Sequence, residues 1–168
     1  MNIKFRSKRI YFVKPMIKFA EFYANNINDI EVYRWLDTNG KQYSIEDEIK
    51  WIKRSKNEPV YAMVTRDNEM IGNINFTHIK DDTGEIGIWI TPSMQNNHYG
   101  REAIERFIKY GFNKMNMNTI YIRVYENNKR AIKCYKSVGF KQYKKQYNKK
   151  DGIGNKTNII CMKIEKER

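Results

Sequence analysis

The chain has 168 residues, of which 40% are hydrophobic and 14% aromatic, and this composition fits one folded domain and excludes a disordered or low-complexity protein. No apolar run approaches the roughly 18 residues of a membrane-spanning helix, and the charged N-terminal segment does not resemble a secretory signal. With 32 basic and 19 acidic residues the net charge is +13, which indicates either a polyanionic partner or a solvated lysine-rich surface.

The N-terminal half begins with a short strand pattern and continues with apolar residues at helical spacing. The expected elements are a strand over Arg9–Val13, helices over Met16–Ile27 and Ile30–Leu36, and a further helix capped by Ser44. Asp47 and Glu48 follow in the first turn of that helix, where negative charge is favourable.

The remainder alternates strands and helices. The expected elements are strands over Val60–Thr65, Met70–Ile79 and Glu85–Thr91, a helix carrying Ala103–Phe112, a strand over Thr119–Tyr125, a helix over Asn128–Val138, and a hairpin of Phe140–Tyr147 with Asn158–Ile164. This order predicts an α+β fold in a single domain, residues 1–168, with a mixed and mostly antiparallel sheet of about seven strands flanked by about four helices.

A polar loop, Ser93–Gly100, connects a predicted strand to a predicted helix. The N-terminus of a helix exposes unpaired main-chain N–H groups and attracts anions, and Gly100 lets a phosphate approach the backbone closely. Further donors are the side chains of Asn96, Asn97, His98 and Arg101. The loop therefore predicts a phosphate-binding segment, with an ordinary connection between strand and helix as the alternative.

A second stretch, from Val124 to Phe140, contains a helix for which Asn128 is a suitable N-cap. Tyr135 lies seven residues further on, two turns along the same face of that helix. A tyrosine hydroxyl in a polar cleft is able to protonate a leaving group. The alternative is an aromatic side chain of the hydrophobic core.

Together these two stretches resemble the GNAT superfamily of N-acetyltransferases, and the resemblance extends over nearly the whole chain. The cofactor motif of that family reads Arg or Gln, two residues, Gly, one residue, then Gly or Ala, and Gln95–Gly100 matches it with His98 at the first glycine position. The block Asn128–Phe140 is similar to the second motif of the family. The segments between Asn28 and Leu36 and from Ser44 to Trp51 resemble the subgroup that acetylates ribosomal-protein N-termini or spermidine.

The resemblance implies acetyl-CoA as the acetyl donor, with its diphosphate on the main-chain amides of Gln95–Gly100. It implies that the pantetheine arm pairs along the strand that contains Ile88 and Ile90, with the N–H near Ile90 facing the thioester oxygen. Tyr135 is the implied general acid, and Glu85 the implied base acting through water. The implied cofactor-binding residues are Ile88, Ile90, Gln95, Asn96, Asn97, His98, Tyr99, Gly100, Arg101, Asn128 and Arg130.

The resemblance also implies a primary amine as acceptor, which attacks the thioester directly in a ternary complex. Candidates are a protein N-terminus, an amino sugar or antibiotic, and a polyamine, and the high positive charge favours acidic or ribosomal partners. The implied acceptor residues are Trp35, Tyr33, Asn73 and Asn75. His78 is a second candidate base, and pairing of two copies through the terminal hairpin stays open.

Two other functions also stay open. One is a basic nucleic-acid-binding module, because lysine and tyrosine interleave in Lys141–Lys150, and the other is a CoA-binding protein without catalytic activity. Cys134 and Cys161 are too few to cross-link a small secreted fold, and no metal-binding cluster surrounds either. We therefore expect a cytoplasmic protein with reduced thiols and no metal.

Overall fold

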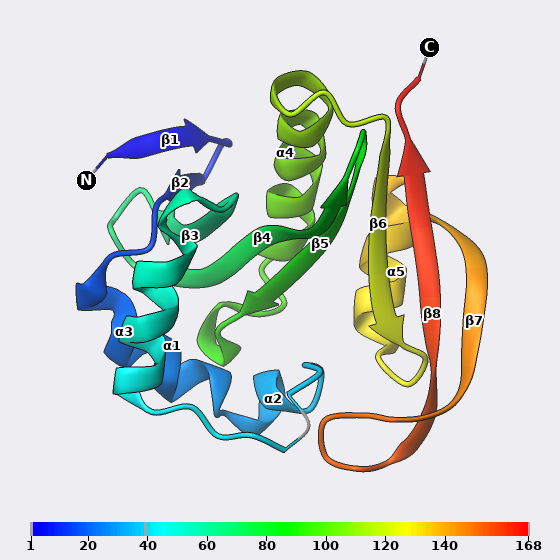
Figure 1. Ribbon diagram of the computed structural model, residues 1–168, viewed down its shortest axis with the longest axis horizontal. Coiled ribbons are helices and arrows are strands. Elements are labelled where there is room, and N and C mark those ends of the chain that lie inside the picture. Colours follow the sequence, from blue (N-terminus) through cyan, green and yellow to red (C-terminus); the bar gives the residue numbers. More distant parts are fainter. Residues whose placement is uncertain (1, 39, 168) are drawn as a thin grey trace.

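A computed structural model describes residues 2–38 and 40–167, in which eight strands form one mixed sheet in the order β1-β2-β3-β4-β5-β6-β8-β7 (Figure 1). The strands are β1 (Ile3–Arg6), β2 (Ile10–Val13), β3 (Val60–Thr65), β4 (Met70–Lys80), β5 (Thr83–Ile90), β6 (Thr119–Tyr125), β7 (Lys141–Lys150) and β8 (Lys156–Glu165). Neighbouring strands are antiparallel, apart from β5 and β6, which run parallel. The predicted α+β fold with a mostly antiparallel sheet is confirmed.

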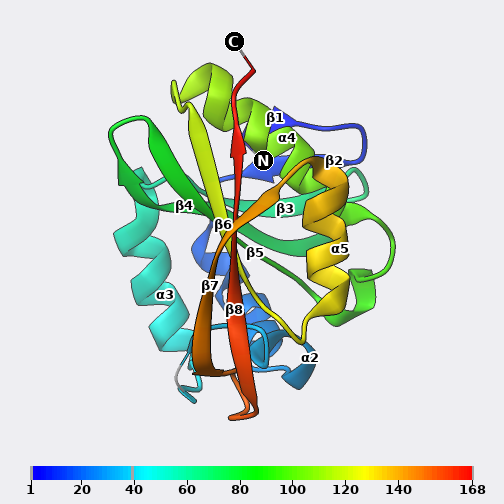
Figure 2. The ribbon, with the colours of Figure 1, turned by 90° about the vertical axis from the view of Figure 1, so that its right-hand side faces the viewer.

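Helices cover both faces of this sheet, with α3 on one side and α4 and α5 on the other (Figure 2). The α-helices are α1 (Ala20–Ile27), α2 (Ile30–Tyr33), α3 (Ile45–Arg54), α4 (Tyr99–Lys114) and α5 (Lys129–Val138). Short 3-10 turns occupy Ile17–Phe19, Ser55–Asn57 and Pro92–Met94. None of the helices in the described ranges is long and apolar enough to cross a membrane.

The helix ends follow the predicted capping residues. The Ser44 hydroxyl accepts a hydrogen bond from the Asp47 N–H, and the Ser44 N–H donates to the Asp47 carboxylate, both at 3.1 Å. At the start of α5 the Asn128 side chain accepts from the Ala131 N–H at 3.3 Å. Gly139 ends that helix with φ +108°, a backbone conformation that favours glycine.

Several boundaries differ from those expected. Strand β1 was not predicted, because three of its four side chains are exposed and a single one, Phe5, is buried. Helix α1 begins at Ala20 after a 3-10 turn, and α2 is one turn long. The terminal hairpin is longer than expected, because its polar, lysine-rich ends continue to pair.

The two faces of the sheet bury two separate clusters. Ile74 and Phe76 of β4, with the isoleucines of β5, pack against α4 and α5 in the larger cluster. On the opposite face Trp89 packs beside the smaller cluster, which α1 and α3 cover. Successive residues of β5 therefore point to different layers.

Candidate active site

The sheet opens between β5 and β6 (Figure 1). Strand β5 pairs with β4 from Glu85 to Ile90, whereas it pairs with β6 through Thr83, Gly84 and Glu85. Strand β6 continues instead alongside β8 as far as Tyr125. Within the described residues β5 therefore has a free edge beyond Glu85, and a cavity of about 600 Å³ lies beside it.

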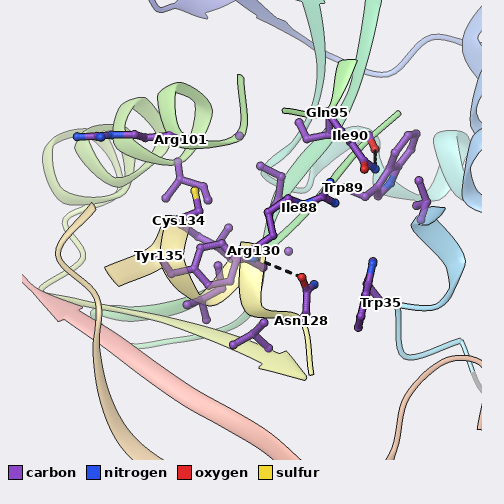
Figure 3. A pocket seen from close by; sticks show the side chains of 18 of the residues that line it. Trp35, Ile88, Trp89, Ile90, Gln95, Arg101, Asn128, Arg130, Cys134 and Tyr135 are labelled. Atoms are coloured by element: carbon purple, nitrogen blue, oxygen red, sulfur yellow. Dashed lines mark hydrogen bonds between the residues drawn. The ribbon is translucent and has the colours of Figure 1, made fainter. Parts of the chain in front are cut away.

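Most residues predicted from the sequence line this cavity (Figure 3). Its walls come from β5, the start of α4, β6, α5 and the chain around Trp35. The predicted residues found there are Trp35, Glu85, Ile88, Ile90, Gln95, Asn96, His98, Tyr99, Gly100, Arg101, Asn128, Arg130 and Tyr135. Residues distributed over 100 positions of the chain thus meet at one cavity.

The segment from Asn96 to Arg101 provides main-chain donors. None of its N–H groups donates to another residue in the described ranges. Asn96 and His98 have φ of +61° and +62°, so two non-glycine residues adopt the left-handed conformation. His98 therefore takes a conformation typical of the glycine it replaces. Alternating backbone conformations next to the positive end of a helix form a concave anion site.

Gln95 and Asn97 play different parts in this segment. The Gln95 side chain lies in the cavity and donates to the Ile90 carbonyl at 2.9 Å (Figure 3). The Asn97 side chain does not line the cavity, because it turns back to donate to the Gln95 carbonyl at 3.0 Å. Of Asn97, the main-chain N–H therefore remains the predicted contact to an anion.

Three cationic side chains surround this end of the cavity. Arg101 pairs with Glu105 at 2.8 Å, and Arg130 lies 3.4 Å from the Asn96 amide oxygen. Lys133, one helical turn after Arg130, also lines the cavity. The sequence analysis missed Lys133, although its place on the same face of α5 was readable from the spacing.

Tyr135 points into the cavity from α5, opposite β5 (Figure 3). Its side chain is 9% exposed, and its hydroxyl has no hydrogen-bond partner in the described part of the chain. Burial raises the pKa of Tyr135 above the usual value for a phenol, so the hydroxyl stays protonated at neutral pH. It is thus a proton donor facing a cavity.

Cys134 lines the cavity beside Tyr135, and Cys161 is buried in β8. Burial raises the pKa of both thiols, which keeps them protonated at neutral pH and makes them poor nucleophiles. No group of three or more His, Cys, Asp or Glu side chains in the described residues is arranged to hold a metal ion.

Glu85 lies where β5 and β6 separate. Its carboxylate accepts a hydrogen bond from Arg123 Nε at 2.7 Å and lies 3.5 Å from His78 Nδ1. The Glu85 side chain is 19% exposed, whereas that of His78 is 69% exposed. The two candidate bases, considered separately in the sequence, are therefore neighbours, with Glu85 facing the cavity and His78 facing solvent.

The end of the cavity away from the anion site has a different charge. Glu31 and Asp37 line it together with Trp35, and neither carboxylate forms an ion pair with a described residue. The Arg34 guanidinium lies 4.3 Å from the Trp35 ring centre. The cavity is thus cationic at one end and carries free carboxylates at the other.

Three predicted acceptor residues lie outside this cavity. Asn73 is 3% exposed, and its amide lies 3.2 Å from the Tyr23 hydroxyl on the opposite side of the sheet. Tyr33 lines a neighbouring cavity of about 450 Å³ beside the β7–β8 loop. Asn75 lies next to Gly87, where its amide oxygen is 2.9 Å from the position of an added Cβ.

Comparisons with known proteins agree with this geometry. A family model for the acetyltransferase (GNAT) domain matches residues 9–141. The acetyltransferase PseH of Campylobacter jejuni is 28% identical over 138 residues, covering 76% of this chain and 87% of that protein.

Two solved structures share the fold. A GNAT-family acetyltransferase from Bacillus anthracis superposes with a TM-score of 0.85 at 19% identity, over 98% of both chains. The spermidine N-acetyltransferase from Vibrio cholerae, in complex with CoA and spermine, superposes with a TM-score of 0.84 at 19% identity, over 93% of this chain and 95% of that one. The predicted fold and family are thereby confirmed.

Proposed function

The chain belongs to the GNAT acetyltransferase family, and from this premise we propose that it transfers the acetyl group of acetyl-CoA to a primary amine in a ternary complex. We propose also that residues 1–168 form one acetyltransferase domain. One observation carries the proposal: the free edge of β5 lies beside a segment whose amides donate to no other described residue. These are the two backbone features that a thioester arm and a diphosphate require.

Acetyl-CoA fits the residues of the cavity. Its diphosphate is placed on the amides of residues 96–101, at the positive end of α4, with Arg101, Arg130 and Lys133 around it. The pantetheine arm is placed along the free edge at Ile88 and Ile90, where its amides pair with the strand. Asn128 lies within the cavity at the start of α5 and borders the same arm.

Acetyl-CoA supplies the activated acetyl thioester. The groups of the protein stabilise the charge that develops during transfer and move protons. The Ile90 N–H is proposed to donate to the thioester oxygen and to stabilise the negative charge that develops there. Glu85 accepts, through water, a proton from the bound ammonium, and the neutral amine that results attacks the thioester, while Tyr135 gives its proton to the departing thiolate. Arg123 and His78 hold Glu85 in place for this exchange.

The acceptor is proposed to attack the thioester directly. The protonated thiol of Cys134 is a poor nucleophile, so the residues favour direct transfer over a covalent enzyme intermediate. The nucleophile is then the amine itself, bound between β5 and the chain around Trp35.

The charge of the acceptor end favours a positively charged amine. Glu31 and Asp37 lack ion-pair partners among the described residues, although the chain carries 32 basic residues. Trp35 offers an aromatic face to a cation in the same region. The net charge of the chain pointed to acidic partners, but the charges next to the substrate decide binding because surface charges are screened within about 10 Å.

The proposal is tested with the full chain, acetyl-CoA and a panel of amines: polyamines, aminoglycosides, amino-sugar nucleotides and peptide N-termini. Release of free thiol is followed with a thiol reagent, and the acetylated product is identified by mass spectrometry. We expect thiol release that depends on the amine, with positively charged small amines or peptides preferred. Failure of every amine, together with no calorimetric binding of CoA, contradicts the proposed function.

A further inference from the structure

A charged cluster outside the cavity joins the β1–β2 turn to the start of α4. The Glu102 carboxylate accepts hydrogen bonds from the Ser7 hydroxyl, the Arg9 N–H and Arg9 Nε, each at 2.7 Å. Arg9 Nη1 donates to the Asn97 carbonyl at 3.1 Å, and the guanidinium lies 4.4 Å from the centre of the Tyr99 ring. One arginine thus connects Glu102 to the segment that precedes it.

The segment that Arg9 contacts is the proposed diphosphate site. Asn97 lies between Asn96 and His98, which both adopt the left-handed conformation at an energetic cost for non-glycine residues. Within the segment, the Asn97 side chain donates to the Gln95 carbonyl. Because left-handed residues persist when surrounding contacts fix them, the bonds from Arg9 are well placed to keep the amides directed at the cavity.

The same cluster balances charge at the anion site. Partial burial by itself would raise the pKa of Glu102, but the hydrogen bonds from Ser7 and Arg9 outweigh burial and lower that pKa, so the carboxylate is ionised at neutral pH. An ionised carboxylate in the first turn of α4 opposes an incoming diphosphate. The paired guanidinium of Arg9 offsets that charge.

We propose that Arg9, oriented by Ser7 and Glu102, is a positioning residue for diphosphate binding, because it holds the Asn97 carbonyl and the Tyr99 ring so that the amides of residues 96–101 face the cavity. The proposal rests on the proposed function, since it takes these amides to bind CoA. Arginine is required because Nε and Nη1 serve two acceptors at once, which a single ammonium group does not reproduce.

The experiment compares Arg9→Met and Arg9→Lys with a matched control, Arg106→Met. Arg106 lies on α4, as Glu102 does; it donates from Nε to the Arg6 carbonyl at 2.7 Å and places its guanidinium 5.0 Å from the Phe5 ring centre. It therefore anchors α4 to the same strand pair, but away from residues 96–101. Each variant is assayed with acetyl-CoA and with S-acetylpantetheine, which carries the thioester and arm without the diphosphate, and CoA binding is measured by calorimetry.

We expect Arg9→Met to raise the KM for acetyl-CoA and the Kd for CoA about tenfold, with kcat and the kcat/KM for S-acetylpantetheine within about twofold of wild type. Arg9→Lys is expected to fall between wild type and Arg9→Met. Arg106→Met lowers the thermal midpoint but leaves the ratio of the two donors unchanged.

Unchanged CoA affinity in Arg9→Met, or an equal loss with both donors, overturns the positioning role and leaves the proposed function intact. A wild-type protein that binds no CoA overturns the proposed function and this proposal with it. Should Arg9→Met fail to fold, Arg9→Lys decides by the same ratio of donors.

Discussion

Tyr135→Phe removes one oxygen atom from the wall of the cavity. The ring stays in place, with its centre 6.2 Å from that of Phe140. Because the hydroxyl has no hydrogen-bond partner among the described residues, its loss leaves no buried polar atom unsatisfied. We expect the free energy of unfolding to change by less than about 1 kcal/mol.

The effect on turnover follows from proton transfer. A positioned general acid contributes about 10²- to 10⁴-fold, and its efficiency falls as its pKa rises above the working pH. Burial raises the pKa of Tyr135, and a thiolate leaves readily because the pKa of a thiol is only about 8.5. Both facts favour the lower end of the range of about 10²- to 10⁴-fold. We therefore expect kcat to fall about 100-fold in Tyr135→Phe, equivalent to about 2.7 kcal/mol of activation free energy.

The assay measures kcat and KM for acetyl-CoA between pH 6 and 10, with the preferred amine of the panel at saturation. The KM of Tyr135→Phe is expected to stay within about twofold of wild type, because the hydroxyl acts in the transition state. In wild type, ionisation of Tyr135 reduces the rate only above the usual tyrosine value of about 10, since burial raises the pKa.

Tyr110→Phe provides the contrast. Its hydroxyl lies 2.8 Å from that of Tyr61, away from the cavity, so its removal costs about 1 kcal/mol of stability without changing kcat. A Tyr135→Phe enzyme with wild-type kcat at every pH refutes the role of Tyr135 as general acid.

Three further predictions concern the anion site, a buried carboxyl and the acceptor end. Gly100→Ala places a Cβ whose nearest described neighbour is 4.0 Å away, so the free energy of unfolding rises by up to about 1 kcal/mol. The added methyl group crowds the proposed diphosphate site, and the calorimetric Kd for CoA is expected to rise about tenfold. Burial, and then the charge of Asp47, raises the pKa of Glu48 to about 7. The stability that the neutral Glu48 carboxyl contributes is therefore complete below pH 4.5 and is lost as the pH rises through 7. In urea unfolding at pH 8, Glu48→Gln is expected to raise the free energy of unfolding by at most about 3 kcal/mol. Glu31→Gln and Asp37→Asn each raise the KM for a positively charged amine about two- to fivefold.

Each of these has a result that contradicts it. Unchanged CoA affinity in Gly100→Ala removes that position from the diphosphate site. Equal gains of Glu48→Gln at pH 4 and pH 8 show that its carboxyl does not titrate with folding. Glu46→Gln is the control for the acceptor end, because Glu46 is exposed on α3 and does not line the cavity. If Glu31→Gln and Asp37→Asn change the KM for the amine no more than Glu46→Gln does, the charge of the acceptor end does not contribute to amine binding.

Local sequence patterns specified where several candidate residues lie in the fold. The loop from Gln95 to Gly100, the Asn128 cap and Tyr135 belong to two short stretches in which neighbours along the chain are neighbours in space. The same is true of the Ser44 cap, where donor and acceptor lie three residues apart. Such features depend on backbone geometry over one or two helical turns, which sequence spacing specifies directly.

Tertiary structure decided what covers each face and where strands separate. Alternation placed Asn73 on one face of β4, but it did not show that Tyr23 would bury it there. The free edge of β5 depends on where β6 diverges, and the support of Asn97 by Arg9 joins residues 88 positions apart. Contacts of this kind arise from the packing of whole elements, since periodicity fixes the direction of a side chain relative to its own strand and not the partner it meets.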